Sequence, residues 1–283
     1  MSKNLNNNFQ RIDDLLNSIN QVENVIVLGS APSLRKINLK KRNTFKIAIG
    51  DLPFRLRNPH NIDLWVTANT EFPNLWNDRH LAMLKRLPIK RILLSTISMN
   101  DGPRDTELFK KRLADINNEK FFFYDQRHSR NEYCKPKSNC CELKECTNIK
   151  NNIQEYIKNK FGAETAQYSN GSTVALHAFA LAICLEPKNI LIAGIELPTS
   201  NSQYKYINNY SKIDRKVSQN IIFQIRKIRN KNKDKHSPFG GEEEKTLKED
   251  FIKLFKLAQF LEIDISIISE SKRLDNYLIE SKK

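Results

Sequence analysis

The sequence predicts an α/β protein whose sheet is mainly parallel and carries helices on both faces. Short apolar runs typical of buried strands alternate with longer stretches of helical spacing. Two of these runs end in a glycine at a strand-to-loop junction, at Gly29 and at Gly194. A hydroxyl-rich segment at 169–173 opens an apolar helix, and the N-terminus of such a helix presents backbone N–H groups to an anion. Together these features indicate a Rossmann-like domain with a nucleotide crevice at the carboxyl ends of its strands.

The elements follow in a regular order. Residues 9–22 carry apolar side chains at helical spacing and are predicted to pack beside the first strand. Strands are expected at 24–29, 45–50, 63–68, 90–96, 120–124, 189–195 and 263–269. Further helices are expected at 72–87, 105–117, 151–160, 172–185 and 243–261.

We expect a single domain over 1–283, because this length can bury a substantial core. Two polar segments interrupt the alternation, a cysteine-containing insertion at 126–150 and a segment at 198–242 that is rich in Asn, Ser, Lys and Tyr. Long segments without clear elements are typical of lids and binding loops. Because 198–242 follows the strand that ends near Glu196, it is predicted to form a lid over the crevice.

The formal net charge of +15 is compatible with nucleic acid, an anionic membrane surface or an acidic substrate. The basic residues are scattered and are not interleaved with aromatic residues as in an RNA-binding surface, so no nucleic-acid partner is expected. No run reaches the roughly 18 apolar residues of a membrane span, and the polar start at 1–8 is not a signal peptide. We therefore expect a cytoplasmic protein, with peripheral contact to the anionic inner face of the membrane.

Five cysteines, an odd number, fit a reducing compartment better than a disulfide scaffold. Four of them are clustered, namely Cys134, Cys140, Cys141 and Cys146. This spacing lacks the paired hooks of structural zinc sites, so no zinc is expected. The fifth, Cys184, lies in an apolar helix and is predicted to belong to the core.

Two loops are predicted to bind the nucleotide. The first follows the strand at 24–29 and contributes Gly29, Ser30, Pro32 and Ser33. The second opens the helix at 172–185 and contributes Asn170, Gly171, Ser172 and Thr173. The first loop alone is a weak signal because it lacks the three-glycine dinucleotide fingerprint, but the two loops together favour a nucleotide or nucleotide-sugar enzyme over a generic α/β domain.

The first loop, within 25–34, resembles the opening motif of bacterial sialyltransferases that use CMP-sialic acid. The start of the helix at 171–175 and the later run 193–196 are similar to that family and to the motility-accessory-factor glycosyltransferases, which attach nonulosonic acids to flagellin. The same pattern occurs in archaeal proteins that resemble 6-hydroxymethylpterin pyrophosphokinase. The resemblance covers four short pieces of the Rossmann core, about half of the chain.

The resemblance implies a glycosyltransferase of bacterial surface glycan synthesis that moves a nonulosonic acid from a CMP-sugar to a glycan or protein acceptor, with inversion. It places donor contacts at Ser30, at Gly50 or Asp51, and at Asn69, of which only Asn69 keeps the family's asparagine. Asn69 has an alternative role as a helix N-cap or turn residue.

For catalysis, the resemblance implies a histidine base in the lid, which falls on His236. Imidazole titrates near working pH and can take the proton of the acceptor hydroxyl. Tyr204 matches a lid tyrosine that donates to the departing phosphate, with Tyr206 and Tyr210 within reach in the sequence. The alternatives are an exposed loop histidine and an edge-strand pair of tyrosines.

No cofactor and no metal are expected. The sequence has neither an Asp-x-Asp motif after a strand nor a phosphate-binding Gly-x-x-x-x-Gly-Lys-Ser loop, although Asp51 and Glu71 stand where they could bind magnesium. Two other functions stay open. One is a pterin or nucleotide pyrophosphokinase that uses ATP and Mg²⁺, and the other is a basic binding module without catalytic activity.

Overall fold

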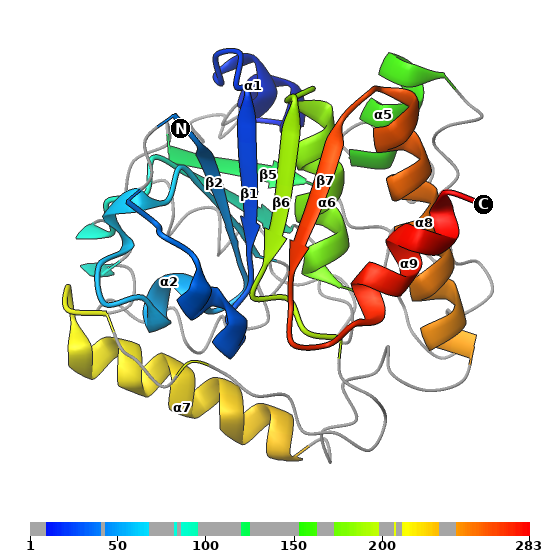
Figure 1. The fold of residues 1–283 in the computed structure, drawn as a ribbon. Helices are drawn as coiled ribbons and strands as arrows, with labels where there is room; N and C mark the ends of the chain where they lie inside the picture. Colours follow the sequence, from blue (N-terminus) through cyan, green and yellow to red (C-terminus); the bar gives the residue numbers. More distant parts are fainter. Residues whose placement is uncertain are drawn as a thin grey trace, which may run out of the picture.

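The protein is described from a computed structural model that covers residues 10–40, 43–67, 82–83, 86–95, 120–124, 153–162, 173–197, 207, 211–231 and 242–283. The strands are β1 (Asn24–Leu28), β2 (Phe45–Ile49), β3 (Leu64–Thr67), β4 (Arg91–Ser95), β5 (Phe121–Tyr124), β6 (Asn189–Ala193) and β7 (Asp264–Ile268). They form one sheet in the order β5-β4-β3-β2-β1-β6-β7, and each of its strand pairs is parallel (Figure 1). The predicted α/β class and the seven predicted strands are confirmed.

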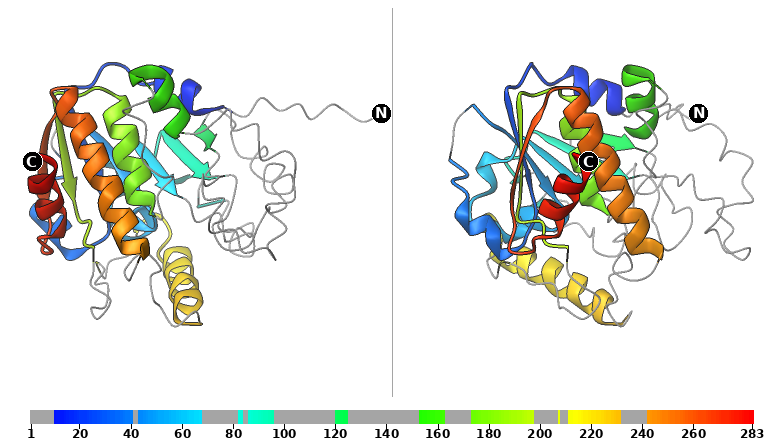
Figure 2. Two further views of the ribbon diagram at one scale, coloured as in Figure 1. Left: turned by 90° about the vertical axis from the view of Figure 1, so that its right-hand side faces the viewer. Right: turned by 45° about the vertical axis from the view of Figure 1, so that its right-hand side comes forward.

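Helices cover both faces of the sheet (Figure 2). One face carries α1 (Ile12–Asn17), α5 (Ile153–Phe161), α6 (Val174–Cys184), α8 (Glu242–Phe260) and α9 (Arg273–Ser281), and the other carries η1 (Pro32–Lys36), α2 (Leu52–Arg55) and α7 (Arg215–Lys231). A further short helix, η2 (Pro59–Asn61), precedes β3. Because successive side chains of a strand point to opposite faces, Val25 and Val27 join the first core, whereas Ile26 and Leu28 join the second.

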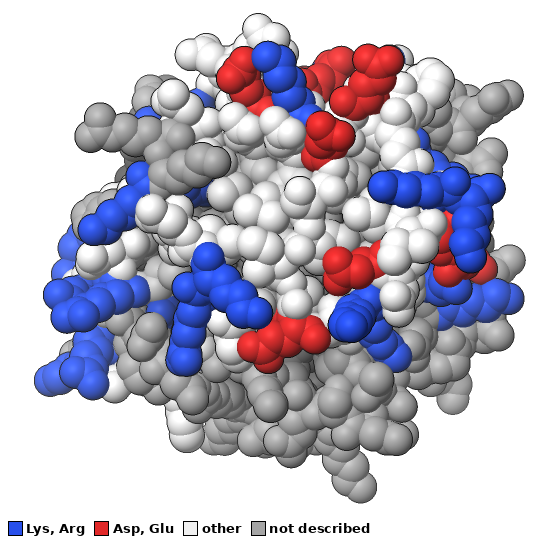
Figure 3. Space-filling model, in the orientation of Figure 1, with Lys and Arg blue, Asp and Glu red and all other residues white. Residues whose placement is uncertain are grey.

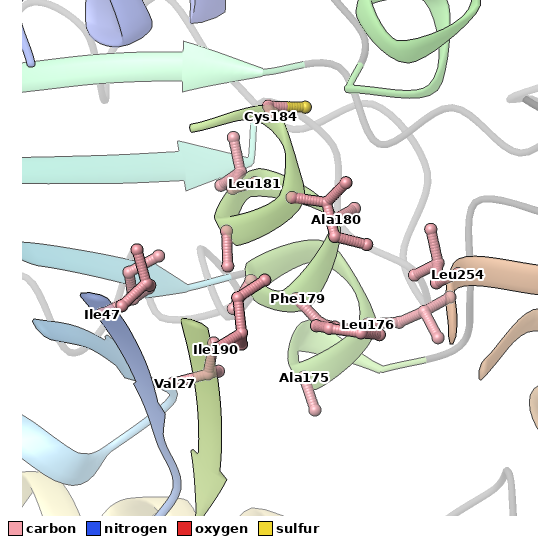
Figure 4. Close-up of a cluster of buried hydrophobic side chains, with 14 of the residues drawn as sticks. Val27, Ile47, Ala175, Leu176, Phe179, Ala180, Leu181, Cys184, Ile190 and Leu254 are labelled. Atoms are coloured by element: carbon pink, nitrogen blue, oxygen red, sulfur yellow. The ribbon is translucent and has the colours of Figure 1, made fainter. Parts of the chain in front are cut away.

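Helix α6 is the central element of the first core. Every side chain from Ala175 to Cys184 is buried, which matches the uniformly apolar sequence of this helix. Its side chains face Val27, Ile47 and Ile190 of the sheet on one side and Leu254 of α8 on the other (Figure 4). Truncating a side chain of this kind costs about 2 to 5 kcal/mol, so α6 fixes the strands next to it.

Three α-helices were not expected from the sequence, α2, α7 and α9. Helix α7 lies within the predicted lid at 198–242, where no clear element was foreseen. Among its residues with described burial, 215–223, the buried ones are Val217, Ser218, Ile221 and Ile222. Figure 1 shows α7 running across the carboxyl edge of the sheet, next to the ends of the strands.

Candidate functional site

The order of the strands reverses at β1. Strands β2 to β5 extend from one side of β1, and β6 and β7 extend from the other. In open α/β sheets, ligands bind outside the carboxyl ends of the strands at such a switch point. The residues that follow β1 and β6 therefore define the candidate site, and they include the first predicted nucleotide loop.

The segments that follow β1 and β6 stay in close contact beyond the ends of these strands. The Gly29 amide donates to the Ala193 carbonyl at 2.8 Å, and the Ala31 amide donates to the Gly194 carbonyl at 2.9 Å. A Cβ atom on Gly29 would lie 2.2 Å from the Gly194 oxygen, and one on Gly194 would lie 2.5 Å from the Gly29 oxygen. The two glycines thus have a packing role at the switch point, besides the donor contact predicted for Gly29.

The loop after β1 is tied to the chain after β6. Pro32 begins η1, and the fully buried Ser33 donates its hydroxyl to Glu196 at 2.6 Å. Ser30 is also buried, and its carbonyl accepts the Ile207 amide at 2.8 Å. The Ser33 hydroxyl is therefore engaged within the protein, and a contact of this loop with a donor stays a prediction.

Glu196, which the sequence analysis did not select, joins the ends of three strands. Its carboxylate accepts the hydroxyls of Ser33 and Ser269 and the amides of Glu270 and Ser271, at distances of 2.5 to 2.8 Å. Burial by itself raises the pKa of Glu196, but these four hydrogen bonds outweigh it and lower the pKa below its usual value. The serine-rich segment 269–271 after the last strand was the available signal for this contact.

Asp51, a predicted donor contact, forms an ion pair. Its Oδ2 lies 2.7 Å from Nη2 of Arg55, and the two side chains are 3% and 1% exposed. The other guanidinium nitrogen, Nη1, donates to the carbonyl of Ile207 at 3.1 Å. The carboxylate that could have bound magnesium is thus engaged by a buried arginine.

The second predicted loop is described only at its last residue. Thr173 has an extended backbone, and its hydroxyl accepts the amide of Ala175 at 3.3 Å, as in an N-cap. Because α6 runs antiparallel to the strand that follows it, its N-terminus lies at the carboxyl edge (Figure 1). Other predicted site residues lie outside the described part of the chain, namely Asn69, Asn170, Gly171, Ser172, Tyr204 and His236.

The described residues bear on two expectations, the absence of a metal site and the absence of a membrane-spanning helix. Within the described ranges, no group of three or more His, Cys, Asp or Glu side chains could hold a metal ion. The four clustered cysteines lie outside those ranges. None of the described helices is both long and apolar enough to cross a membrane.

No protein-family model matches the chain, and no curated protein matches it. Among solved structures, the chain is similar to the sialyltransferase CstII from Campylobacter jejuni in complex with a substrate analogue, CMP-3FNeuAc. The identity is 15%, the TM-score is 0.42, and the match covers 91% of this chain and 84% of that one. A CstII variant in complex with CMP matches at 15% identity and a TM-score of 0.47, over 90% of this chain and 85% of that one.

Proposed function

We propose that the chain is a glycosyltransferase that binds a CMP-sugar at the β1/β6 switch point and transfers a nonulosonic acid to a glycan or protein acceptor. The observation that carries the proposal is the position of the loop at 29–33. This loop holds the sequence motif that resembles the sialyltransferases, and it follows the strand at which the sheet order reverses. The N-terminus of α6 lies at the same edge and offers backbone N–H groups to the phosphate.

The proposed roles of the side chains follow the resemblance. His236 takes the proton of the acceptor hydroxyl as the anomeric carbon is attacked. Tyr204 donates to the phosphate of the departing CMP. No metal is needed in this scheme, because a single phosphate can be held by N–H groups and hydroxyls. The acceptor is left as a glycan or a protein.

Exposed basic side chains near the carboxyl edge form a surface that could meet an anionic membrane. Arg35, Lys36, Arg57 and Lys212 are exposed, and they belong to η1 or lie next to α2 and α7 near the carboxyl edge. Figure 3 shows Lys and Arg gathered on the flank that carries α2, with acidic residues only beside the innermost of them. We propose that this flank supports peripheral contact with an anionic membrane, and binding to vesicles with and without anionic lipid tests it.

A thermal-shift series with CMP, CDP, ATP, UDP and GDP tests the nucleotide. A ligand that binds only the folded state raises the melting temperature, and we expect selective stabilisation by CMP or CDP without metal. Stabilisation by ATP that requires magnesium would instead support the pyrophosphokinase. Steep salt-dependent binding of nucleic acid, with no response to any nucleotide, would support the basic binding module.

Turnover of a CMP-sugar tests the base. His236→Ala is expected to lower kcat by about a hundredfold or more, with donor affinity nearly unchanged. An alanine variant with full activity would rule out His236 as the base. An alanine variant that no longer binds the donor would make it a nucleotide ligand.

A further inference from the structure

A buried arginine outside the predicted site connects three segments at the carboxyl edge. Arg55 lies on α2, and only 1% of its side chain is exposed. One guanidinium nitrogen binds Asp51, at the end of β2, and the other binds the carbonyl of Ile207, in the chain that follows β6. The amide of the same Ile207 donates to the carbonyl of Ser30, in the loop after β1. Both polar groups of one backbone residue are thus held by segments that follow β1 and β2.

The surroundings of Arg55 make this connection rigid. The indole of Trp65 donates to the carbonyl of Gly50 at 2.7 Å, and its ring meets Phe54 edge-on with centroids 5.4 Å apart. Further along the chain, the amides of Ser211 and Lys212 donate to the carbonyls of Phe54 and Arg57, at 2.9 and 3.1 Å. The described residues between β6 and α7 therefore contact α2 or the residues just after it at several points, and Arg55 makes its contact at Ile207, whose amide binds Ser30.

We infer that Arg55 is a positioning residue of the nucleotide site, which it serves by holding the chain at Ile207 against the loop at 29–33. A planar guanidinium can bind a carboxylate and a carbonyl at once in fixed directions, and an ammonium group cannot reproduce this geometry. The inference rests on the proposed function only where it concerns nucleotide affinity. The anchoring of Ile207 can be measured without any ligand.

The test uses variants that remove the connection and keep the fold. Arg55→Met alone removes the ion-pair partner of a buried carboxylate, which is strongly destabilising, whereas replacing both partners of a buried ion pair by apolar residues is often tolerated. The informative variants are therefore Asp51→Leu combined with Arg55→Met, and Arg55→Lys. Arg57→Met is the matched control, because Arg57 is exposed and it is the backbone carbonyl of Arg57 that accepts the Lys212 amide.

Hydrogen exchange at the Ile207 amide gives the first result. In both test variants, we expect exchange to accelerate about tenfold or more relative to the wild type and Arg57→Met, the size of effect that follows from losing a charge-assisted hydrogen bond. The expected second result is a CMP dissociation constant raised several-fold in Arg55→Lys, the variant that keeps the predicted donor contact Asp51. Unchanged exchange in a folded variant would overturn the inference, and so would faster exchange with unchanged CMP affinity.

Failure of the proposed function gives a different pair of results from failure of the inference about Arg55. In that case the wild type itself shows no CMP binding, while the exchange rate of Ile207 still decides whether Arg55 anchors this segment. If the variants bind CMP as tightly as the wild type and the Ile207 amide still exchanges slowly, Arg55 is not a positioning residue. The glycosyltransferase proposal is then unaffected.

Discussion

Replacing Gly29 by alanine should destabilise the protein far more than a glycine replacement in open space. The new Cβ would lie 2.2 Å from the Gly194 oxygen and 2.8 Å from both the Gly194 carbonyl carbon and Cγ1 of Ile195. The first two of these atoms belong to the backbone, so no change of side-chain rotamer relieves the overlap. The chains after β1 and β6 must move apart instead.

The expected cost follows from the contacts that this movement strains. Overpacking in a tight interior costs about 1 to 3 kcal/mol. The movement also weakens the hydrogen bonds from Gly29 to Ala193 and from Ala31 to Gly194, each worth about 0.5 to 1.5 kcal/mol. We expect a total near 3 kcal/mol, which corresponds to a fall of about 6 to 12 °C in melting temperature for a chain of this size.

Gly50→Ala is the matched control. Gly50 has a φ of +58°, and a Cβ there would have no neighbour within 4 Å. The change therefore adds only the strain of a left-handed backbone, about 1 kcal/mol. Urea denaturation and thermal melting of the wild type and the two variants compare the effects directly. If Gly29→Ala were no more destabilising than Gly50→Ala, the close contact between the two strand ends would be refuted.

Three further predictions concern stability and reactivity. The folded-state pKa of Glu196 lies below its ordinary value of 4.5, so the carboxylate stabilises the fold above that pH and the contribution is lost as the pH falls through the folded-state pKa. The wild type should thus lose stability below about pH 4.5 more steeply than Glu196→Gln, and parallel acid denaturation curves would contradict this. Thr173→Ala should cost about 1 kcal/mol in urea denaturation, and Thr173→Ser should cost much less. Equal losses would argue against the cap. Burial raises the pKa of the Cys184 thiol to about 12. A variant with serine at the other four cysteines should therefore not react with a thiol reagent at pH 8 until it is unfolded. Prompt reaction of the native protein would show that the thiol is accessible.

Most of the strands could be predicted because they are short apolar runs that are buried on both faces of a parallel sheet, although the edge strand β7 is only partly buried. Helix α6 was predictable for the same reason, since its residues from Ala175 to Cys184 are all buried. Helix α7 was not predicted because it lies in a polar segment rich in Asn, Ser, Lys and Tyr, although its apolar residues recur at helical spacing. Its role in covering the second core depends on tertiary packing.

The sequence indicated the switch point of the sheet but not the contacts around it. The glycine after β1 and the small residues beside it marked the switch point. The hydrogen bond from Ser33 to Glu196 joins residues 163 positions apart, and the Arg55 contact with Ile207 joins residues 152 positions apart. A local sequence pattern cannot identify hydrogen-bond partners that are so far apart. It also does not distinguish a buried carboxylate or guanidinium from an exposed one.

The central place of β1 in the sheet also bears on how the chain folds during synthesis. β1 is the first strand to emerge, yet its partner on one side is β6, and the side chains of Asn24 and Asn189 that meet there are 165 residues apart. Until β6 arrives, one edge of β1 has none of the hydrogen bonds that it makes in the finished sheet, and open apolar strand edges are prone to pair with other chains. A nascent chain that ends before 189 should therefore aggregate or require a chaperone, and pairing across so long a separation should make folding slow.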